Sequence, residues 1–394
     1  MRSSIGIGIN KIKPECSTEK MSIQFLAYTL LLLLTCTPAT SVPTRSVLIF
    51  RHCLRSTPTS GYGAPGYSQF DNYSTQPTHH FPAWPVPVYQ CLPHGIDLVQ
   101  AAGRQLSASF PTPVIFKVDT TAKRDNDTAN ALLHGMGSSQ KYQAAPALFN
   151  PVGQGLCPKM NKGKAIAALK ARFDRVPVPS GHKQRLKHLQ DILGKGVAPS
   201  IPEIPDSVLS NGYFTGGSSI ASEFAEAFLM QWGGKLPTAW GEITTVEDIY
   251  DLLSTHIYYR GINDRVLSVV ARSHSMMTNA IIQHLKSGTG TLILVGHDSD
   301  LDALGELFGL SWHTAPFPPN ATTPGSALRF DLTLSSAENE NENENIAASI
   351  HYQNFNGSAD VQTVPAMFQW STENMPSLMS IDNYLKTRLD PACM

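Results

Sequence analysis

Short apolar runs alternate along the chain with longer stretches whose apolar residues recur every three or four positions. The apolar runs predict buried strands, and the three-to-four spacing predicts helices that bury one face. Strands are expected at residues 46–50, 114–118 and 291–295. Helices are expected at residues 94–110, 125–136 and 264–286. Strands alternating with helices at both ends of the chain indicate an α/β sheet flanked by helices.

The middle of the chain, residues 155–264, carries helical patterns without strand patterns. It is therefore expected to form a mainly helical lobe inserted into the α/β domain, which would comprise residues 42–154 and 265–394. Apolar residues then alternate with polar ones at 327–334 and 346–352, as in strands with one buried face. The acidic run ENENENEN at 338–345 predicts a disordered hairpin tip between these two strands.

The N-terminus has the order of a secretory signal. Lysines precede the apolar run at 23–34, and small and polar residues follow it. We expect residues 1–41 to be leader and signal, with Met1 or Met21 as the start. The run is short for a membrane span, although an uncleaved anchor is the alternative. The mature protein would then be secreted or periplasmic, without a stable membrane span.

Export changes how the cysteines are interpreted. After signal removal Cys53, Cys91, Cys157 and Cys393 remain, and their three complete pairings are equally compatible with the sequence. A free thiol at Cys53 is a further alternative. Four N-x-S/T sites, which are candidates for glycosylation, lie at Asn72, Asn126, Asn320 and Asn356.

Charge gives little support to nucleic-acid binding. Charged residues make up 15% of the 394-residue chain, the formal net charge is −1, and the lysines and arginines are scattered. A nucleic-acid binder is expected to gather basic residues into a patch or stripe. We therefore expect a small-molecule partner instead.

Candidate catalytic and binding residues lie just after two of the predicted strands. Arg51, His52 and Arg55 follow the strand at 46–50, and His297 and Asp298 follow the strand at 291–295. If these strands are parallel neighbours, the two groups meet beyond their carboxyl ends, where α/β sheets bind ligands. Arg124, shortly after the strand at 114–118, is the third arginine that would converge there.

Arginines, histidine and a carboxylic acid in one pocket suit phosphoryl transfer. Guanidinium groups bind phosphate oxygens in a forked geometry. A neutral imidazole can attack phosphorus to form a phosphohistidine, and Asp298 can protonate the leaving alkoxide. This chemistry requires no metal or cofactor. Each motif alone also fits a plainer interpretation: a surface loop at Arg51-His52, a helix N-cap at Asp298 and a solvated charge run around Arg124.

The two motifs, Arg51-His52-x-x-Arg55 and His297-Asp298, resemble those of the histidine acid phosphatases, the branch of the histidine phosphatase superfamily that includes phytases. The chain is most similar in appearance to the bacterial periplasmic glucose-1-phosphatases and phytases. Further stretches carry this resemblance across residues 45–334: WPVPVYQCLPHG, FNPV, SEFAEAFLMQWGG, AWGEIT, ARSHSMM, LVGHDSDLDALGELFGLSW and TPGSALRF. The resemblance implies a histidine-phosphatase-like sheet with a helical cap at 155–264.

The resemblance also implies roles for single residues. His52 would be the nucleophile and Asp298 the proton donor, while the phosphate ligands would be Arg51, Arg55, Arg124 and His297. Arg124 is placed by its similarity to the family's Arg-x-x-x-Ser/Thr-Ala segment. Cys53 departs from the family's usual glycine, and a glycan on nearby Asn126 would block the pocket, so we expect Asn126 to be unmodified.

Substrate choice is expected to depend on Glu223 and Glu226, which fall where family members place a substrate-side residue. Carboxylates there would disfavour a highly phosphorylated substrate, unless they belong to a solvated helix face. The sequence thus predicts a secreted acid phosphatase that acts on phosphomonoesters, with sugar phosphates such as glucose 1-phosphate ahead of phytate. The alternatives are a phytase and a non-catalytic secreted binding protein with the same fold, which Cys53 alone supports.

Overall fold

The computed structural model describes residues 43–58, 70–74, 84–196, 198–334 and 344–394. The expected leader and signal, residues 1–41, lies outside these residues, as does most of the acidic run at 338–345. No helix within the described ranges is long and apolar enough to cross a membrane.

The described strands form an eight-stranded mixed sheet with the order β3-β2-β6-β1-β8-β9-β10-β7 and a separate two-stranded ribbon, β4-β5. The strands are β1 (Arg45–Arg51), β2 (Val114–Val118), β3 (Gln143–Ala144), β4 (Ser207–Val208), β5 (Phe214–Thr215), β6 (Gly290–Gly296), β7 (Leu310–Trp312), β8 (Ala327–Leu334), β9 (Glu344–Tyr352) and β10 (Gln362–Phe368). β1 pairs in parallel with β6 and antiparallel with β8. The predicted parallel pairing of the strands at 46–50 and 291–295 is therefore confirmed.

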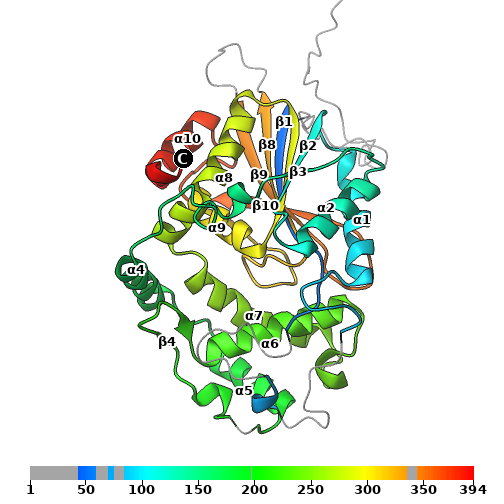
Figure 1. Cartoon of the computed structure of the whole chain (residues 1–394). Coiled ribbons are helices and arrows are strands. Elements are labelled where there is room, and N and C mark those ends of the chain that lie inside the picture. Colours follow the sequence, from blue (N-terminus) through cyan, green and yellow to red (C-terminus); the bar gives the residue numbers. More distant parts are fainter. Residues whose placement is uncertain (1–42, 59–69, 75–83, 197, 335–343) are drawn as a thin grey trace, which may run out of the picture. The chain divides into compact units, whose positions relative to one another are not determined.

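Helices cover both faces of the large sheet (Figure 1). They are α1 (Pro93–Ser107) and α2 (Lys123–Gly135) on one face, and α8 (Leu267–Ser287), α9 (Asp298–Phe308) and α10 (Leu378–Lys386) on the other. β1 shows why both faces are covered. Val47 and Ile49 pack against the α8–α10 side, whereas Leu48 and Phe50 pack against the α1–α2 side. A strand buried on both faces has the continuous apolar sequence that β1 displays.

A short helix, α3 (Pro146–Phe149), precedes the middle of the chain, which contributes α4 (Lys162–Arg175), α5 (His182–Leu193), α6 (Gly217–Gly233) and α7 (Val246–Asn263). α5, α6 and α7 share a hydrophobic core that also includes Leu98 of α1 and Tyr352 of β9, and residues of α6 are buried almost throughout. The expectation that this region lacks strands was wrong in one detail, because β4 and β5 form their short ribbon within it. Figure 1 shows α6 and α7 across the end of the large sheet.

The C-terminal strands follow the predicted alternation. β8 and β9 pair antiparallel over residues 327–334 and 344–351, as a hairpin requires. β9 begins at Glu344, so the last two residues of the acidic run belong to a strand and not to the expected disordered tip. β7, β10 and α10 were not predicted.

Candidate active site

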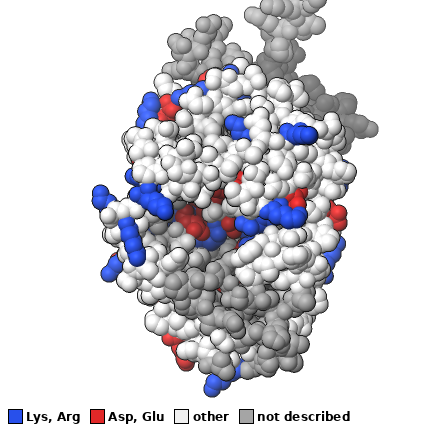
Figure 2. Space-filling view, in the orientation of Figure 1, with Lys and Arg blue, Asp and Glu red and all other residues white. Residues whose placement is uncertain are grey.

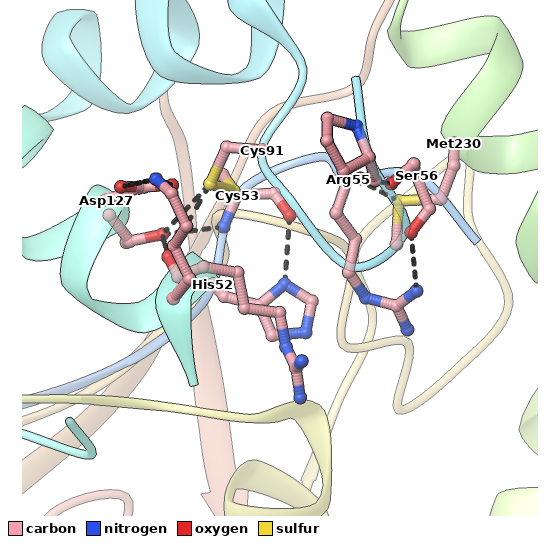
Figure 3. The surroundings of a disulfide bond; sticks show 11 residues. His52, Cys53, Arg55, Ser56, Cys91, Asp127 and Met230 are labelled. Carbon is pink, nitrogen blue, oxygen red and sulfur yellow. Dashed lines mark hydrogen bonds and ion pairs between the residues drawn. A yellow bond between two sulfur atoms is a disulfide. The ribbon is translucent and has the colours of Figure 1, made fainter. Parts of the chain in front are cut away.

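His52 lies directly after β1 and is 2% exposed. Its backbone N–H donates to the carbonyl of Gly296 at the end of β6 (2.9 Å), which joins the two motifs through the sheet. Its Nδ1 lies 2.9 Å from the carbonyl oxygen of Cys53 (Figure 3). Because a carbonyl only accepts, Nδ1 carries the proton and Nε2 keeps its lone pair. The site therefore holds an imidazole with one nitrogen available as a nucleophile.

The charge state of His52 suits the same role. Burial, followed by the positive charges of Arg55, Arg124 and Arg51, holds the pKa of His52 well below its usual value. These effects favour the neutral form of the imidazole. A neutral imidazole is the form that can attack an electrophile.

Arg51 and Arg55 share one buried carboxylate. Oε1 of Glu226, from α6, lies 2.5 Å from Arg51 Nη2 and 3.5 Å from Arg55 Nη2. Burial opposes ionisation of Glu226, but the charges of Arg55 and Arg51 outweigh it and lower its pKa to about 2. Arg51 also donates to the carbonyl of Thr322. Glu226 thus orients the two arginines and neutralises part of their charge.

Arg124 and His297 meet on the other side of His52. Nη2 of Arg124, in the first turn of α2, lies 3.3 Å from Nδ1 of His297, and the His52 and His297 rings are 5.8 Å apart. Nε2 of His297 faces two carboxylates, those of Asp119 (3.3 Å) and Asp125 (3.4 Å). Burial lowers the pKa of His297, but the hydrogen bond to Asp119 and the charge of Asp125 outweigh it and raise the pKa. The prediction that both histidines face one site is confirmed by their ring separation.

Asp298 is the first residue of α9, and its Oδ2 is held by two arginines. Arg51 Nη2 lies 3.0 Å and Arg260 Nη1 lies 3.1 Å from this atom. Burial opposes ionisation, but the charges of Arg260 and then Arg51 hold the pKa of Asp298 well below its usual value. The simple N-cap interpretation is wrong. His297 is the N-cap residue, and the carboxylate that accepts its backbone N–H is Asp300, at 2.7 Å.

A pocket of about 620 Å³ opens beside this cluster, and its lining includes Arg55, Glu226 and Asp298. Figure 2 shows acidic and basic side chains gathered in a hollow of the surface. Glu223, His256 and Arg260 of α6 and α7 also line it. Glu223 and Glu226 are 7% and 6% exposed, so the alternative of a solvated helix face is wrong. The remaining predicted residues, His52, Arg51, Arg124 and His297, lie beside this pocket and do not line it.

The sequence analysis missed several residues of the cluster. Asp119 directly follows β2, and its position just past a predicted strand was a signal of the same kind as that of His52. Arg260 lies near the end of α7 in a segment without any recognisable motif. Tyr89 was also missed. The guanidinium carbons of Arg55 and Arg124 lie 5.6 and 5.7 Å from the centre of its ring, within the range of cation–π interactions.

The cysteines pair as Cys53–Cys91 and Cys157–Cys393. The free thiol considered for Cys53 is therefore wrong, and the oxidation sensitivity that it would bring does not apply. Figure 3 shows the first disulfide beside His52. Asn126 is partly buried, and its side-chain amide donates to the carbonyls of Ala122 and Thr120. The unmodified state of Asn126 stays a prediction.

Two groups of side chains have ligand atoms close enough to share a metal ion. They are Asp119, Asp125 and His297, and Glu226, His256 and Asp298. Arginines already contact members of both groups, Arg124 at His297 and Arg51 and Arg260 at Asp298. A cation at either place would have to compete with these guanidinium groups. Chemistry without a metal therefore stays our prediction for this site.

Known proteins are similar to this chain in sequence and fold, although no family model matches it. It is 26% identical over 305 residues to the phytase AppA of Escherichia coli (strain K12), which covers 64% of this chain and 69% of that protein. The solved phytase from Citrobacter braakii superposes with a TM-score of 0.73 at 23% identity, over 89% of this chain and 99% of its own. A Hafnia alvei phytase solved with myo-inositol hexakis sulphate has a TM-score of 0.76 at 20% identity, over 91% and 99%. These two structures establish the fold.

The sequence similarity to AppA spans most of both proteins, and the sheet, its flanking helices and the order of the two motifs agree with it. In sequence and in fold the chain is thus similar to phytases of the histidine acid phosphatase type.

Proposed function

We propose that the protein is an acid phosphatase that hydrolyses phosphomonoesters through a phosphohistidine at His52. The observation that carries this proposal is the state of His52 itself. Its imidazole is neutral, its Nδ1 proton is committed to the Cys53 carbonyl, and three arginines lower its pKa from close range. The Escherichia coli relative, a phytase, supports the same reaction class.

In the first step Nε2 of His52 bonds to phosphorus while the bond to the leaving oxygen breaks. Arg51, Arg55 and Arg124 stabilise the charge on the phosphoryl oxygens. Asp298 gives its proton to the leaving alkoxide. In the second step water attacks the phosphohistidine, Asp298 takes a proton from that water, and phosphate leaves as His52 is restored.

Asp298 must therefore gain a proton before the first step, although it is ionised in the substrate-free protein. A bound phosphate places negative charge close to the carboxylate and draws Arg51 toward its own oxygens. Both effects raise the pKa of Asp298. We expect activity at acidic pH, where this proton is available.

Helices of the 155–264 lobe are proposed to act as a cap that sets substrate preference. They supply Glu223, Glu226, His256 and Arg260 to the pocket lining. Buried carboxylates in this lining favour a leaving group that offers hydroxyl donors over one that carries further phosphates. Sugar phosphates thus remain the preferred proposal, and the phytase relatives keep phytate as the second candidate. The ratio of kcat/KM for glucose 1-phosphate and phytate decides between them.

The non-catalytic alternative loses its support in the sequence. It rested on Cys53, which the structure places in a disulfide, with its carbonyl fixing the proton of His52. Two disulfides also support an oxidising compartment, because cytosolic proteins rarely keep them. We propose that the protein works outside the cytoplasm.

The test of the reaction is hydrolysis of p-nitrophenyl phosphate near pH 5. His52→Ala should abolish turnover, while His188→Ala, at a solvent-accessible histidine of α5, should leave it unchanged. Activity retained in folded His52→Ala protein would overturn the proposal.

A further inference from the structure

Arg260 contacts the candidate proton donor, Asp298, and two further carboxylates, those of Asp302 and Asp264. Its Nη1 lies 3.1 Å from Asp298 Oδ2, its Nε donates to Asp302 Oδ2 at 2.6 Å, and its Nη2 lies 3.3 Å from Asp264. The side chain is 8% exposed and lines the pocket. Asp302 is also bound by Arg265, whose Nη2 lies 2.8 Å from Oδ1. Arg260 is thus fixed from one side and presents its other edge to Asp298.

We infer that Arg260 is a positioning residue for Asp298, which orients the Oδ2 atom in the pocket and sets the pH range in which this acid holds its proton. The inference rests on the proposed phosphatase reaction. The geometry distinguishes Arg260 from Arg51, the other partner of the same oxygen. Arg51 lies beside His52 and is needed by the phosphoryl group, whereas Arg260 is anchored to Asp302 and Asp264 and stays with the carboxylate through the reaction.

The charges around Asp298 come from each element that packs against it. Arg51 and His52 face it from the end of β1, and Arg260 and His256 face it from α7. Its negative neighbours are Glu226 on α6, Asp264 after α7 and Asp302 on α9. Among these groups Arg260 is the cation that lowers the pKa of Asp298 most. Substitution of Arg260 removes this cation and leaves the negative neighbours in place, so Asp298 should keep its proton to higher pH.

The experiment is the pH dependence of kcat for an alkyl phosphate, whose leaving group needs a proton, and for p-nitrophenyl phosphate, whose leaving group does not. In Arg260→Met the alkaline fall of kcat for the alkyl phosphate should move up by about one to three pH units, since an opposite charge at this distance shifts a carboxyl pKa by that amount. The profile for p-nitrophenyl phosphate should stay in place. Arg260→Lys, which retains the charge, should recover more than half of the shift.

Arg265→Met is the matched control. It removes the other arginine on Asp302 and should cost similar stability, but Arg265 makes no contact with Asp298, so the pH profile should not move. If Arg260→Met folds poorly, the double variant Arg260→Met/Asp264→Asn removes one of the negative charges near Asp298, and the shift should keep its upward direction but be smaller.

Separate results test the inference and the reaction. An unmoved profile in Arg260→Met, or an equal shift in Arg265→Met, overturns the positioning role. A raised KM with an unmoved profile also overturns it, and places Arg260 among the substrate ligands. If the wild-type protein is inactive, or active without His52, the reaction itself fails.

Discussion

Nδ1 of His52 donates to the carbonyl oxygen of Cys53 across 2.9 Å, within the same short segment that leaves β1. This bond assigns the nucleophilic lone pair to Nε2. We predict that protein quenched during turnover carries phosphate on Nε2 of His52, measured by mass spectrometry and by 31P NMR of the alkali-stable phosphohistidine. His52→Ala should carry no label. A phosphoryl group on Nδ1, or on another residue, would contradict the assignment.

The convergence of the two motifs was predictable because continuous apolar strands leave few choices. Residues 47–50 and 292–295 must be buried on both faces, and parallel strands in an α/β sheet bring their carboxyl ends together. His52, His297 and Asp298 therefore follow from sequence pattern. The position of Arg124 shortly after the strand at 114–118 also predicted its convergence on the site, but its surroundings, AKRDND, are equally typical of a solvated charge run, and the family resemblance was needed to choose between the two.

Other parts of the site depend on how the helical lobe packs, which sequence pattern does not specify. Arg260 reaches Asp298 because α7 crosses the pocket. The spacing of residues within α7 does not predict where the helix lies relative to the pocket. The cysteine pairing was also undetermined, because four cysteines allow three pairings without any local signal. Glu226 was predicted as a pocket residue, but its ion pairs with Arg51 and Arg55 appear only in three dimensions.

The disulfide beside His52 should matter for catalysis as well as stability. Cys53–Cys91 closes a loop of 38 positions, for which chain entropy predicts about 4 kcal/mol of stabilisation. We expect Cys53→Ala/Cys91→Ala to lower both the unfolding free energy and kcat, because Cys53 supplies the carbonyl that orients His52. Cys157→Ala/Cys393→Ala should lower stability alone. Equal kcat in the two double variants would show that the first disulfide has no part in orienting the histidine.

Glu226 should make the fold sensitive to acid. Its folded pKa of about 2 lies below the unfolded value, so its stabilisation is complete above about pH 4.5 and is lost as pH falls toward 2. Between pH 5 and pH 3 the wild-type protein should lose about 2 kcal/mol more unfolding free energy than Glu226→Gln. Urea unfolding at both pH values measures this difference. Glu242→Gln, at an exposed position, should behave like the wild type.

Asp125 should have the opposite dependence. It is fully buried, neither carboxylate oxygen accepts a hydrogen bond, and burial outweighs His297 and Arg124 to raise its pKa to about 8. The unfolded chain releases this proton near pH 4, so Asp125 lowers stability progressively as pH rises from 4 to 8. Asp125→Asn should raise the unfolding free energy by about 2 to 4 kcal/mol at pH 7 and by little at pH 4. Asp127→Asn, two residues along α2, is the control; a gain at pH 4 equal to that at pH 7 would refute the titration.

The role of Asp298 can be tested by comparing substrates whose leaving groups differ in their need for a proton. Its Oδ2 lies between Arg51 and Arg260 at the edge of the pocket, and its Oδ1 accepts the backbone N–H of Ser299 at 2.9 Å. Asp298→Asn retains the shape and an oxygen for that local bond, but it offers no acidic proton.

An alkoxide departs slowly without a proton, whereas p-nitrophenolate is a weak base and departs unaided. General acids typically contribute 10²- to 10⁴-fold, so kcat for an alkyl phosphate should fall by about that factor, and kcat for p-nitrophenyl phosphate by less than about tenfold. Asp300→Asn, which alters the carboxylate that caps α9 and also contacts His274, should slow both substrates alike, because it changes how His297 and the helix start are held and leaves the proton of Asp298 in place. Equal losses on the two substrates in Asp298→Asn would assign Asp298 to orienting the arginines, and the proton would then have to come from another acid of the pocket lining, with Glu226 the first to be changed.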